Sequence, residues 1–203
     1  MKIPSSVTGF GPEATVYAKK NGHITVKGER KSNDIRVERT CDDRYEVTVN
    51  GRSHTYTKDE LQKLTIKGGK RADNIYVGEG VDVPVKILGG KGADRIENYA
   101  NNAVIKGGRG NDTILNAGDN ARIYAGRGSD VVLNDGNNAT IRGGRGRDFL
   151  SNNGDGGTMH GGRGHDIVNA NGEGTTILSS RGRDTLNLDP AWLSGMLSRH
   201  LQG

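Results

Sequence analysis

Aspartate recurs every 18 residues through the second half of this 203-residue chain, each time at the end of a glycine-rich turn. Parallel strands lie about 4.8 Å apart, so residues one repeat apart are expected to stack as a column. Carboxylates at that spacing repel by roughly 3–4 kcal/mol per pair at an effective dielectric near 20, and a cation must offset this. Calcium is the candidate, because it accepts six or more carboxylate and carbonyl oxygens. The column comprises Asp94, Asp112, Asp130, Asp148, Asp166 and Asp184, with Asp73 as a further member.

The turns that precede these aspartates supply the second kind of oxygen ligand. A typical unit opens Gly-Gly-Arg-Gly-x-Asp, as in residues 107–112. Such a turn can direct carbonyl oxygens inward, and two adjacent turns can hold an ion between them. We therefore expect up to five calcium sites between the turns from Asp94 to Asp184. The glycines assigned to these sites are Gly107, Gly108, Gly110, Gly126, Gly128, Gly144, Gly146, Gly162 and Gly164.

A basic residue occupies the third position of every such turn. The ladder consists of Lys91, Arg109, Arg127, Arg145, Arg163 and Arg181, preceded by Lys70. In one interpretation each side chain pairs with an acidic neighbour and partly replaces calcium. In the other, the ladder binds a polyanion such as an acidic polysaccharide, lipopolysaccharide or the phospholipid headgroups of a host-cell surface. Aromatic residues are not interleaved with the ladder, which argues against nucleic acid as the partner.

Catalytic chemistry has little support. The histidines show no repeated spacing, and none lies beside an evident nucleophile. His160 and His165 flank one turn, where exposed histidines are the simplest interpretation, and Cys41 has no partner for an internal disulfide. The sequence predicts a protein that is not an enzyme.

The elements that must position these columns follow from the same period. Each 18-residue unit divides into two halves, each a turn followed by a short strand. Alternation along the strands directs Ile114 and Ile123 inward. Only 32% of residues are hydrophobic and 33 are glycine, which suits a thin roll better than a wide core. We predict an all-β fold, a right-handed parallel β-roll (β-solenoid) of 18-residue coils. Its apolar columns are Ile96, Ile114, Val132, Leu150, Val168 and Leu186, and Ile87, Ile105, Ile123, Ile141, Met159 and Ile177.

The second turn of each coil lacks the motif. It reads Asn116-Ala-Gly-Asp or Asn134-Asp-Gly-Asn, with no opening Gly-Gly and no aspartate at the sixth place. We expect no calcium at this edge and instead a ladder of stacked asparagine side chains joined by hydrogen bonds.

The organisation along the chain follows from where the repeat begins and ends. We assign 1–22 to an N-terminal leader, 23–67 to a degenerate coil and a β-hairpin cap, 68–189 to the repeats and 190–203 to a short capping helix. The hairpin is predicted from alternating residues on both sides of Asn50-Gly51. The helix is predicted from apolar spacing after Pro190.

The turn-and-strand unit resembles the haemolysin-type calcium-binding nonapeptide repeat of the RTX family, whose pattern is Gly-Gly-x-Gly-x-Asp-x-apolar-x. The resemblance covers about residues 68–188 and implies a β-roll with calcium bound between successive turns by the aspartates and turn carbonyls. The chain departs from the pattern in having the motif on one edge only and a basic residue at the third position. Its terminal turns are also weaker, with Arg71 at a glycine position and Ser179-Ser180 in place of Gly-Gly.

Export is expected from the same resemblance, since RTX-like proteins are typically secreted by bacteria. The first residues lack the apolar stretch of a cleavable signal, and no run approaches the length of a membrane span. With Ile3, Pro4, nearby serines and no acidic residue before Glu13, the N-terminus resembles the uncleaved leaders of type III secretion, and a C-terminal type I signal is the alternative. Millimolar external calcium would match the weak affinity of extracellular sites, about 10⁻⁴ to 10⁻³ M.

Overall fold

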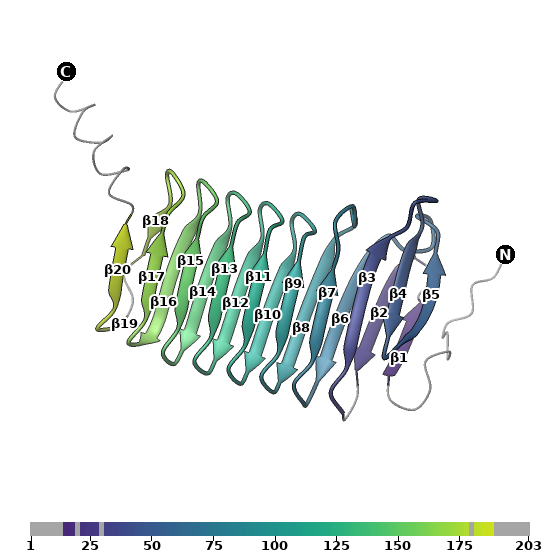
Figure 1. Ribbon diagram of the computed structural model, residues 1–203, viewed down its shortest axis with the longest axis horizontal. Coiled ribbons are helices and arrows are strands. Elements are labelled where there is room, and N and C mark those ends of the chain that lie inside the picture. The colour runs from purple at the N-terminus through teal and green to yellow at the C-terminus, as the bar shows by residue number, and fades with distance from the viewer. Residues whose placement is uncertain (1–13, 19–20, 29–30, 179–180, 189–203) are drawn as a thin grey trace, which may run out of the picture.

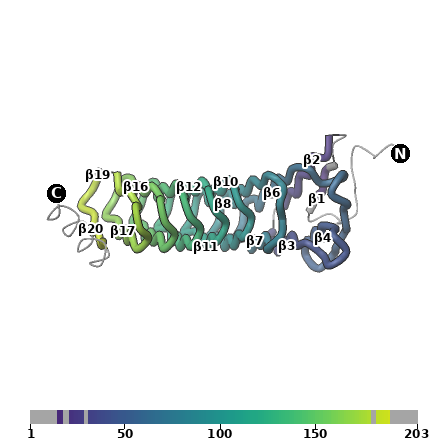
Figure 2. The backbone as a smooth tube through the Cα atoms, turned by 90° about the horizontal axis from the view of Figure 1, so that it is seen from above, coloured from purple at the N-terminus to yellow at the C-terminus, as the bar shows by residue number. Residues whose placement is uncertain are grey.

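The chain winds as a flattened roll whose two broad faces are β-sheets. The computed structural model describes residues 14–18, 21–28, 31–178 and 181–188, and the regular elements in these ranges are all strands. The strands run across the long axis of the rod, and turns line its two long edges (Figure 1). Seen from above, the coils succeed one another along a single axis (Figure 2). The predicted parallel β-roll is confirmed.

Each sheet contains ten strands. The first sheet has the order β1 (Ala14–Ala18), β2 (His23–Gly28), β6 (Lys63–Gly69), β8 (Val85–Lys91), β10 (Val104–Arg109), β12 (Arg122–Arg127), β14 (Thr140–Arg145), β16 (Thr158–Gly164) and β18 (Thr176–Ile177), with β19 (Arg181–Gly182) also paired to β16. The second has the order β20 (Thr185–Leu188), β17 (Ile167–Ala170), β15 (Phe149–Asn152), β13 (Val131–Asn134), β11 (Thr113–Asn116), β9 (Arg95–Asn98), β7 (Asn74–Val77), β3 (Asp34–Arg39), β4 (Tyr45–Val49) and β5 (Arg52–Tyr56).

The 18-residue period sets the register between coils. Ile105 pairs with Ile123 in the first sheet, and Ile114 pairs with Val132 in the second. Both predicted apolar columns fill the narrow space between the sheets, and their central members are fully buried. The last coil is less covered, since Leu186 is 54% exposed. Because each coil contributes one large apolar residue per sheet, turns at either edge are held in fixed register with their neighbours.

The N-terminal end closes the stack with antiparallel strands. β3 runs parallel to β7, so the degenerate coil is present, and β4 and β5 then extend the second sheet as a hairpin. Asn50 and Gly51 at its tip both have positive φ, 51° and 76°, as a type I′ turn requires. Tyr45 and Val47 of β4 are buried and cover the end of the core.

Two expectations about the ends have different outcomes. Part of the segment assigned to a leader is a strand: β1 lies antiparallel to β2, with fully buried Val16 opposite Val26. The helix expected over 190–203 lies outside the described residues and receives no support. No helix in the described ranges is long and apolar enough to cross a membrane.

Candidate metal centre

The Gly-Gly-Arg-Gly-x-Asp turns share one edge of the roll, each linking a strand of the first sheet to the next strand of the second. Gly108 and Gly110, at the second and fourth positions, have φ of 124° and 125°. Residues with a Cβ rarely adopt this region. A Cβ on Gly108 would also lie 2.2 Å from the carbonyl oxygen of Gly90 in the preceding coil. Glycine is therefore required here by backbone conformation and by the close stacking of coils.

The aspartates that end these turns point into the roll rather than to solvent. Their exposed fractions are only 1–3%. This places a row of carboxylates at the inner side of the turn edge, next to the apolar columns. The buried members are Asp73, Asp94, Asp112, Asp130, Asp148 and Asp166.

One oxygen of each buried carboxylate is used in stacking. The backbone N–H of Asp94 donates to Oδ1 of Asp112 at 2.9 Å, and that of Asp112 donates to Oδ1 of Asp130 at 2.8 Å. The same bond joins Asp130 to Asp148, Asp148 to Asp166 and Asp166 to Asp184, each at 3.0 Å. The aspartate column is thus a continuous hydrogen-bonded ladder from coil to coil.

The second oxygen of each carboxylate has no partner. Oδ2 is buried and accepts no hydrogen bond in any of the six buried aspartates. Buried polar atoms are nearly always satisfied, so a row of unsatisfied carboxylate oxygens calls for an explanation.

At the turns that open with glycine, a small space, the place of the missing side chain, lies beside Oδ2 of the aspartate. A Cβ placed on Gly107 would lie 2.5 Å from Oδ2 of Asp112 and 2.5 Å from the carbonyl oxygen of Ala125 in the next coil. The same pair of oxygens surrounds Gly89, where the distances are 2.4 Å to Oδ2 of Asp94 and 2.6 Å to the carbonyl oxygen of Gly107. The spaces at Gly68, Gly89, Gly107 and Gly143 are therefore each bordered by a carboxylate oxygen of one coil and a carbonyl oxygen of the next.

Burial raises the pKa of the aspartate column. Desolvation is the main cause, and it is partly offset by the backbone hydrogen bond to Oδ1, which lowers the pKa. The neighbouring carboxylates add to the rise, and the pKa reaches about 6 at Asp94, about 7 at Asp112 and about 7 at Asp148. The pKa values of Asp73, Asp130 and Asp166 are also raised, with desolvation as the first cause. At Asp166 the nearby charges of His160 and His165 act in the opposite direction and lower the pKa, but desolvation outweighs them.

Calcium fits this donor set. It is a hard cation that takes oxygen ligands from carboxylates and backbone carbonyls. Its charge would satisfy the unpartnered Oδ2 atoms and oppose the repulsion between stacked carboxylates. The residues that would hold it are the column aspartates, through Oδ2, and the first-position residues, through their carbonyl oxygens. The first-position residues from coil to coil are Gly89, Gly107, Ala125, Gly143 and Gly161.

The structure distinguishes among the glycines that the sequence assigned to the sites. It brings the first-position carbonyls, such as those of Gly107 and Gly161, close to the space beside a carboxylate. The carbonyl oxygens of Gly108 and Gly110 instead face the glycines of the following coil, 2.3 Å and 2.0 Å from a Cβ built there. Sequence reasoning missed the carbonyl of Ala125, because only the turn geometry shows which carbonyl faces the carboxylate.

The opposite edge of the roll pairs its buried asparagines from coil to coil, and Oδ1 of Asn98, in the first member of this ladder, is the atom left without a hydrogen bond. Nδ2 of Asn116 donates to the carbonyl of Gly118 at 2.7 Å and to Oδ1 of Asn134 at 2.6 Å. Asn134 repeats this pattern with Gly136 and Asn152, at 2.6 Å each. This is the predicted asparagine ladder, and its neutral amides need no cation. The two edges therefore use the same register with different electrostatic requirements.

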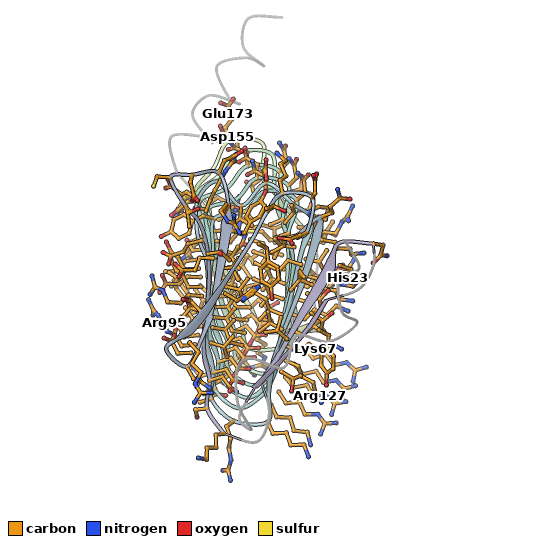
Figure 3. The ribbon with its side chains drawn as sticks, turned by 90° about the vertical axis from the view of Figure 1, so that its right-hand side faces the viewer. His23, Lys67, Arg95, Arg127, Asp155 and Glu173 are labelled. Carbon is orange, nitrogen blue, oxygen red and sulfur yellow. The ribbon has the colours of Figure 1, made fainter. Side chains whose placement is uncertain are left out.

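The basic ladder lies outside the same turns that hold the carboxylates inside. Arg109, Arg127, Arg145 and Arg163 are all exposed. Arg127 projects from the lower corner of the cross-section, whereas Asp155 and Glu173 mark the asparagine edge at the top (Figure 3). The recorded ion pairs of the described residues include no member of the ladder. The pairing interpretation therefore has no support at these arginines, and the acidic side chains of their own turns are buried.

A second kind of metal site, built from side chains alone, would need several ligating groups close together. The described residues contain no group of three or more histidine, cysteine or acidic side chains arranged to hold a metal, and Cys41 is an exposed free thiol. The aspartate edge would instead bind a cation through carboxylate oxygens together with backbone carbonyl oxygens.

Comparison with known proteins agrees with this geometry. A family model described as the RTX calcium-binding nonapeptide repeat (4 copies) matches residues 65–83, 86–114 and 98–132. No curated protein and no solved structure matches the chain. The coils beyond residue 132 continue the same strand register and the same aspartate hydrogen bonds.

Proposed function

Because the RTX calcium-binding nonapeptide repeat model matches the repeats between residues 65 and 132, we propose that this protein is a non-enzymatic, secreted bacterial protein that binds calcium along one edge of a β-roll. The bound edge stiffens the rod, which then presents a fixed surface to a partner. The observation that carries the proposal is the row of buried, unpartnered Oδ2 atoms. Those of Asp73, Asp94, Asp112 and Asp148 border the space at a first-position glycine together with a carbonyl oxygen of the next coil.

The residues of the aspartate edge act together in this proposal. Oδ1 of each carboxylate keeps the coils in register, and Oδ2 is left to bind the cation. When bound, calcium supplies the positive charge that keeps the carboxylates ionised at neutral pH. Because each site needs oxygens from two coils, binding stabilises the contact between coils and couples calcium to folding.

Coupling between calcium binding and folding would assist secretion. A chain that is unstable at low cytosolic calcium can leave the cell unfolded and fold where calcium is abundant. The affinity should then lie in the extracellular range, about 10⁻⁴ to 10⁻³ M. A dissociation constant in the nanomolar range, measured by isothermal titration calorimetry, would contradict this part of the proposal.

The experiment that tests calcium binding compares two triple variants of equal charge. In the first, Asp112, Asp130 and Asp148 are changed to Asn. The control changes the acidic residues of the opposite edge, Asp119, Asp135 and Asp155, to Asn. Thermal unfolding is followed by circular dichroism in saturating calcium and in EDTA.

We expect the wild type and the control to gain stability from calcium, and the first variant to gain little. The first variant should still fold in EDTA, because asparagine Oδ1 can accept the same backbone N–H, as it does at the other edge. If calcium raises the melting temperature of all three proteins equally, or of none, the proposed site is wrong.

A further inference from the structure

The first sheet carries basic side chains on its outer face and no acidic ones. Among the described residues, no strand of this sheet contains aspartate or glutamate. The second sheet differs, since Arg36 lies beside Glu38 and Arg95 beside Glu97 as ion pairs. The exposed lysines and arginines of the first sheet are here named the basic face: Lys27, Lys63, Lys67, Lys86, Lys91, Lys106, Arg109, Arg122, Arg127, Arg142, Arg145 and Arg163.

One margin of the basic face is a straight line of cations. Lys91 pairs in register with Arg109, Arg109 with Arg127, and Arg127 with Arg145. Parallel strands set the step between them at about 4.8 Å. The neighbours of each cation along this line are further cations, so they repel one another, and no recorded ion pair of the described residues relieves this repulsion. A bound anion running along the line would offset it.

A groove follows this line. Its volume is about 780 Å³, and the side chains from Lys70 to Arg145 line it together with second-position glycines. Gly90, Gly108 and Gly126 leave the floor free of side chains. A ligand can therefore approach the backbone while the long basic side chains reach it from the side.

A second column of cations lies further up the same sheet. Lys106 and Arg142, from the coils on either side, lie over the ring of Tyr124 at 5.5 Å and 5.9 Å from its centre. These cation–π contacts hold two more positive charges parallel to the groove. Figure 3 shows the blue nitrogens of such side chains gathered on the side of the roll that carries Lys67 and Arg127.

The composition of the basic face and the spacing of its cations indicate which class of polyanion it fits. Single-stranded nucleic acid needs several aromatic platforms, whereas Tyr124 is the one aromatic residue on strands β8 to β16 of this sheet and already contacts cations. Stable attachment to a lipid surface uses inserted apolar side chains. The exposed large apolar residues of the described chain are Tyr17, Tyr99, Ile167, Leu178, Leu186 and Leu188, none of them on β6 to β16. A rigid line with one cation per step of about 4.8 Å instead matches a linear polymer with one acidic group per sugar unit.

We propose that the basic face binds a linear anionic polysaccharide, laid along the axis of the roll with its acidic groups against the cations of the groove. Guanidinium groups suit this role, because they form paired hydrogen bonds with carboxylates. The inference goes beyond calcium binding and rests on the fold and its surface charge.

The test uses short oligogalacturonides, which carry one carboxylate per sugar, and two triple variants of equal net charge. The groove variant changes Arg109, Arg127 and Arg145 to Gln. The control changes Arg36, Arg52 and Arg95 of the second sheet to Gln. Binding is measured by calorimetry over a range of salt concentrations, in saturating calcium and in EDTA, with circular dichroism to confirm folding.

We expect the groove variant to lose at least tenfold in affinity and the control to stay within about twofold. Release of counterions contributes about 0.7 to 0.9 per cation to the dependence of log affinity on log salt, so the slope of the groove variant should fall by about two. Equal losses in both variants would show attraction to net charge alone and overturn the proposal. Tighter binding to single-stranded poly(dT) or to phosphatidylglycerol vesicles would also overturn it. Calcium binding is measured in the same samples, so failure of the two proposals can be told apart.

Discussion

Gly107→Ala directly tests the proposed calcium site between Oδ2 of Asp112 and the carbonyl oxygen of Ala125. The backbone of Gly107 has no positive φ, so alanine adds a methyl group without backbone strain. That methyl would lie 2.5 Å from Oδ2 of Asp112 and from the carbonyl oxygen of Ala125, whereas ordinary contacts begin at 3.4 Å. Both oxygens must move by about 0.9 Å. Calcium ligands lie within a range of 2.3–2.6 Å, so a shift of this size removes two of them.

The natural chain has an alanine at the equivalent position of the next turn. Ala125 already places a methyl group at the first position of its own turn, beside Asp130. We therefore expect the site at Asp130 to be the weakest along the central coils, and Ala125→Gly to strengthen it. The two substitutions thus predict opposite changes at neighbouring turns.

The expected loss of stability follows from the linkage between calcium binding and folding. At free calcium 100 times the dissociation constant, one site contributes about 2.7 kcal/mol to stability. For a chain of this size that corresponds to a shift in melting temperature of about 5–10 °C. Calorimetry should show one calcium fewer for Gly107→Ala, and circular dichroism should show a larger loss in calcium than in EDTA. An equal loss of stability in calcium and in EDTA, with the same number of bound calcium ions, would refute this calcium site and indicate only a packing defect.

Three further predictions concern pH, the asparagine edge and the core. Without calcium, the raised pKa values of Asp94, Asp112 and Asp148, about 6, 7 and 7, mean that the folded state holds more protons than the unfolded state. The stability in EDTA should therefore fall as pH rises from about 4 to about 7, and the stabilisation by calcium should grow over the same range; a melting temperature in EDTA that rises with pH would contradict this. Asn134→Ala leaves buried partners unsatisfied and should cost about 1–3 kcal/mol in urea unfolding, with calcium stoichiometry unchanged; loss of calcium would show that the two edges are not independent. Ile123→Ala should cost about 2–5 kcal/mol in the same assay, and a value near zero would contradict a single packed column.

The sequence predicted the repeating part of the fold because its columns report one structural unit many times. Ile114 and Ile123 are separated by half a period and point inward from opposite sheets, which alternation alone implies. The asparagine ladder was predictable for the same reason, since Asn116 and Asn134 recur in register at a turn. β1 was not predictable, because Ala14–Ala18 stands outside the repeat and is fixed only by pairing with β2.

The site was only partly predictable. The spacing of the aspartates indicates that they stack, but it does not show which of their oxygens is left without a partner. Which turn carbonyl faces that oxygen depends on the positive φ of Gly108 and Gly110, which turns their carbonyls away. The spacing also does not show whether Arg109 forms an ion pair with Asp112. The structure shows that the side chain of Arg109 is exposed, whereas the carboxylate of Asp112 is buried.

The most direct measurement of the central claim is a crystal structure of the protein grown in excess calcium. We predict a row of ions inside the glycine-rich edge, each bound to Oδ2 of a column aspartate such as Asp112 and to a first-position carbonyl of the next coil. No ion should lie at the asparagine edge. An empty aspartate edge, or ions only at the outer acidic residues such as Asp119 and Asp155, would contradict the account.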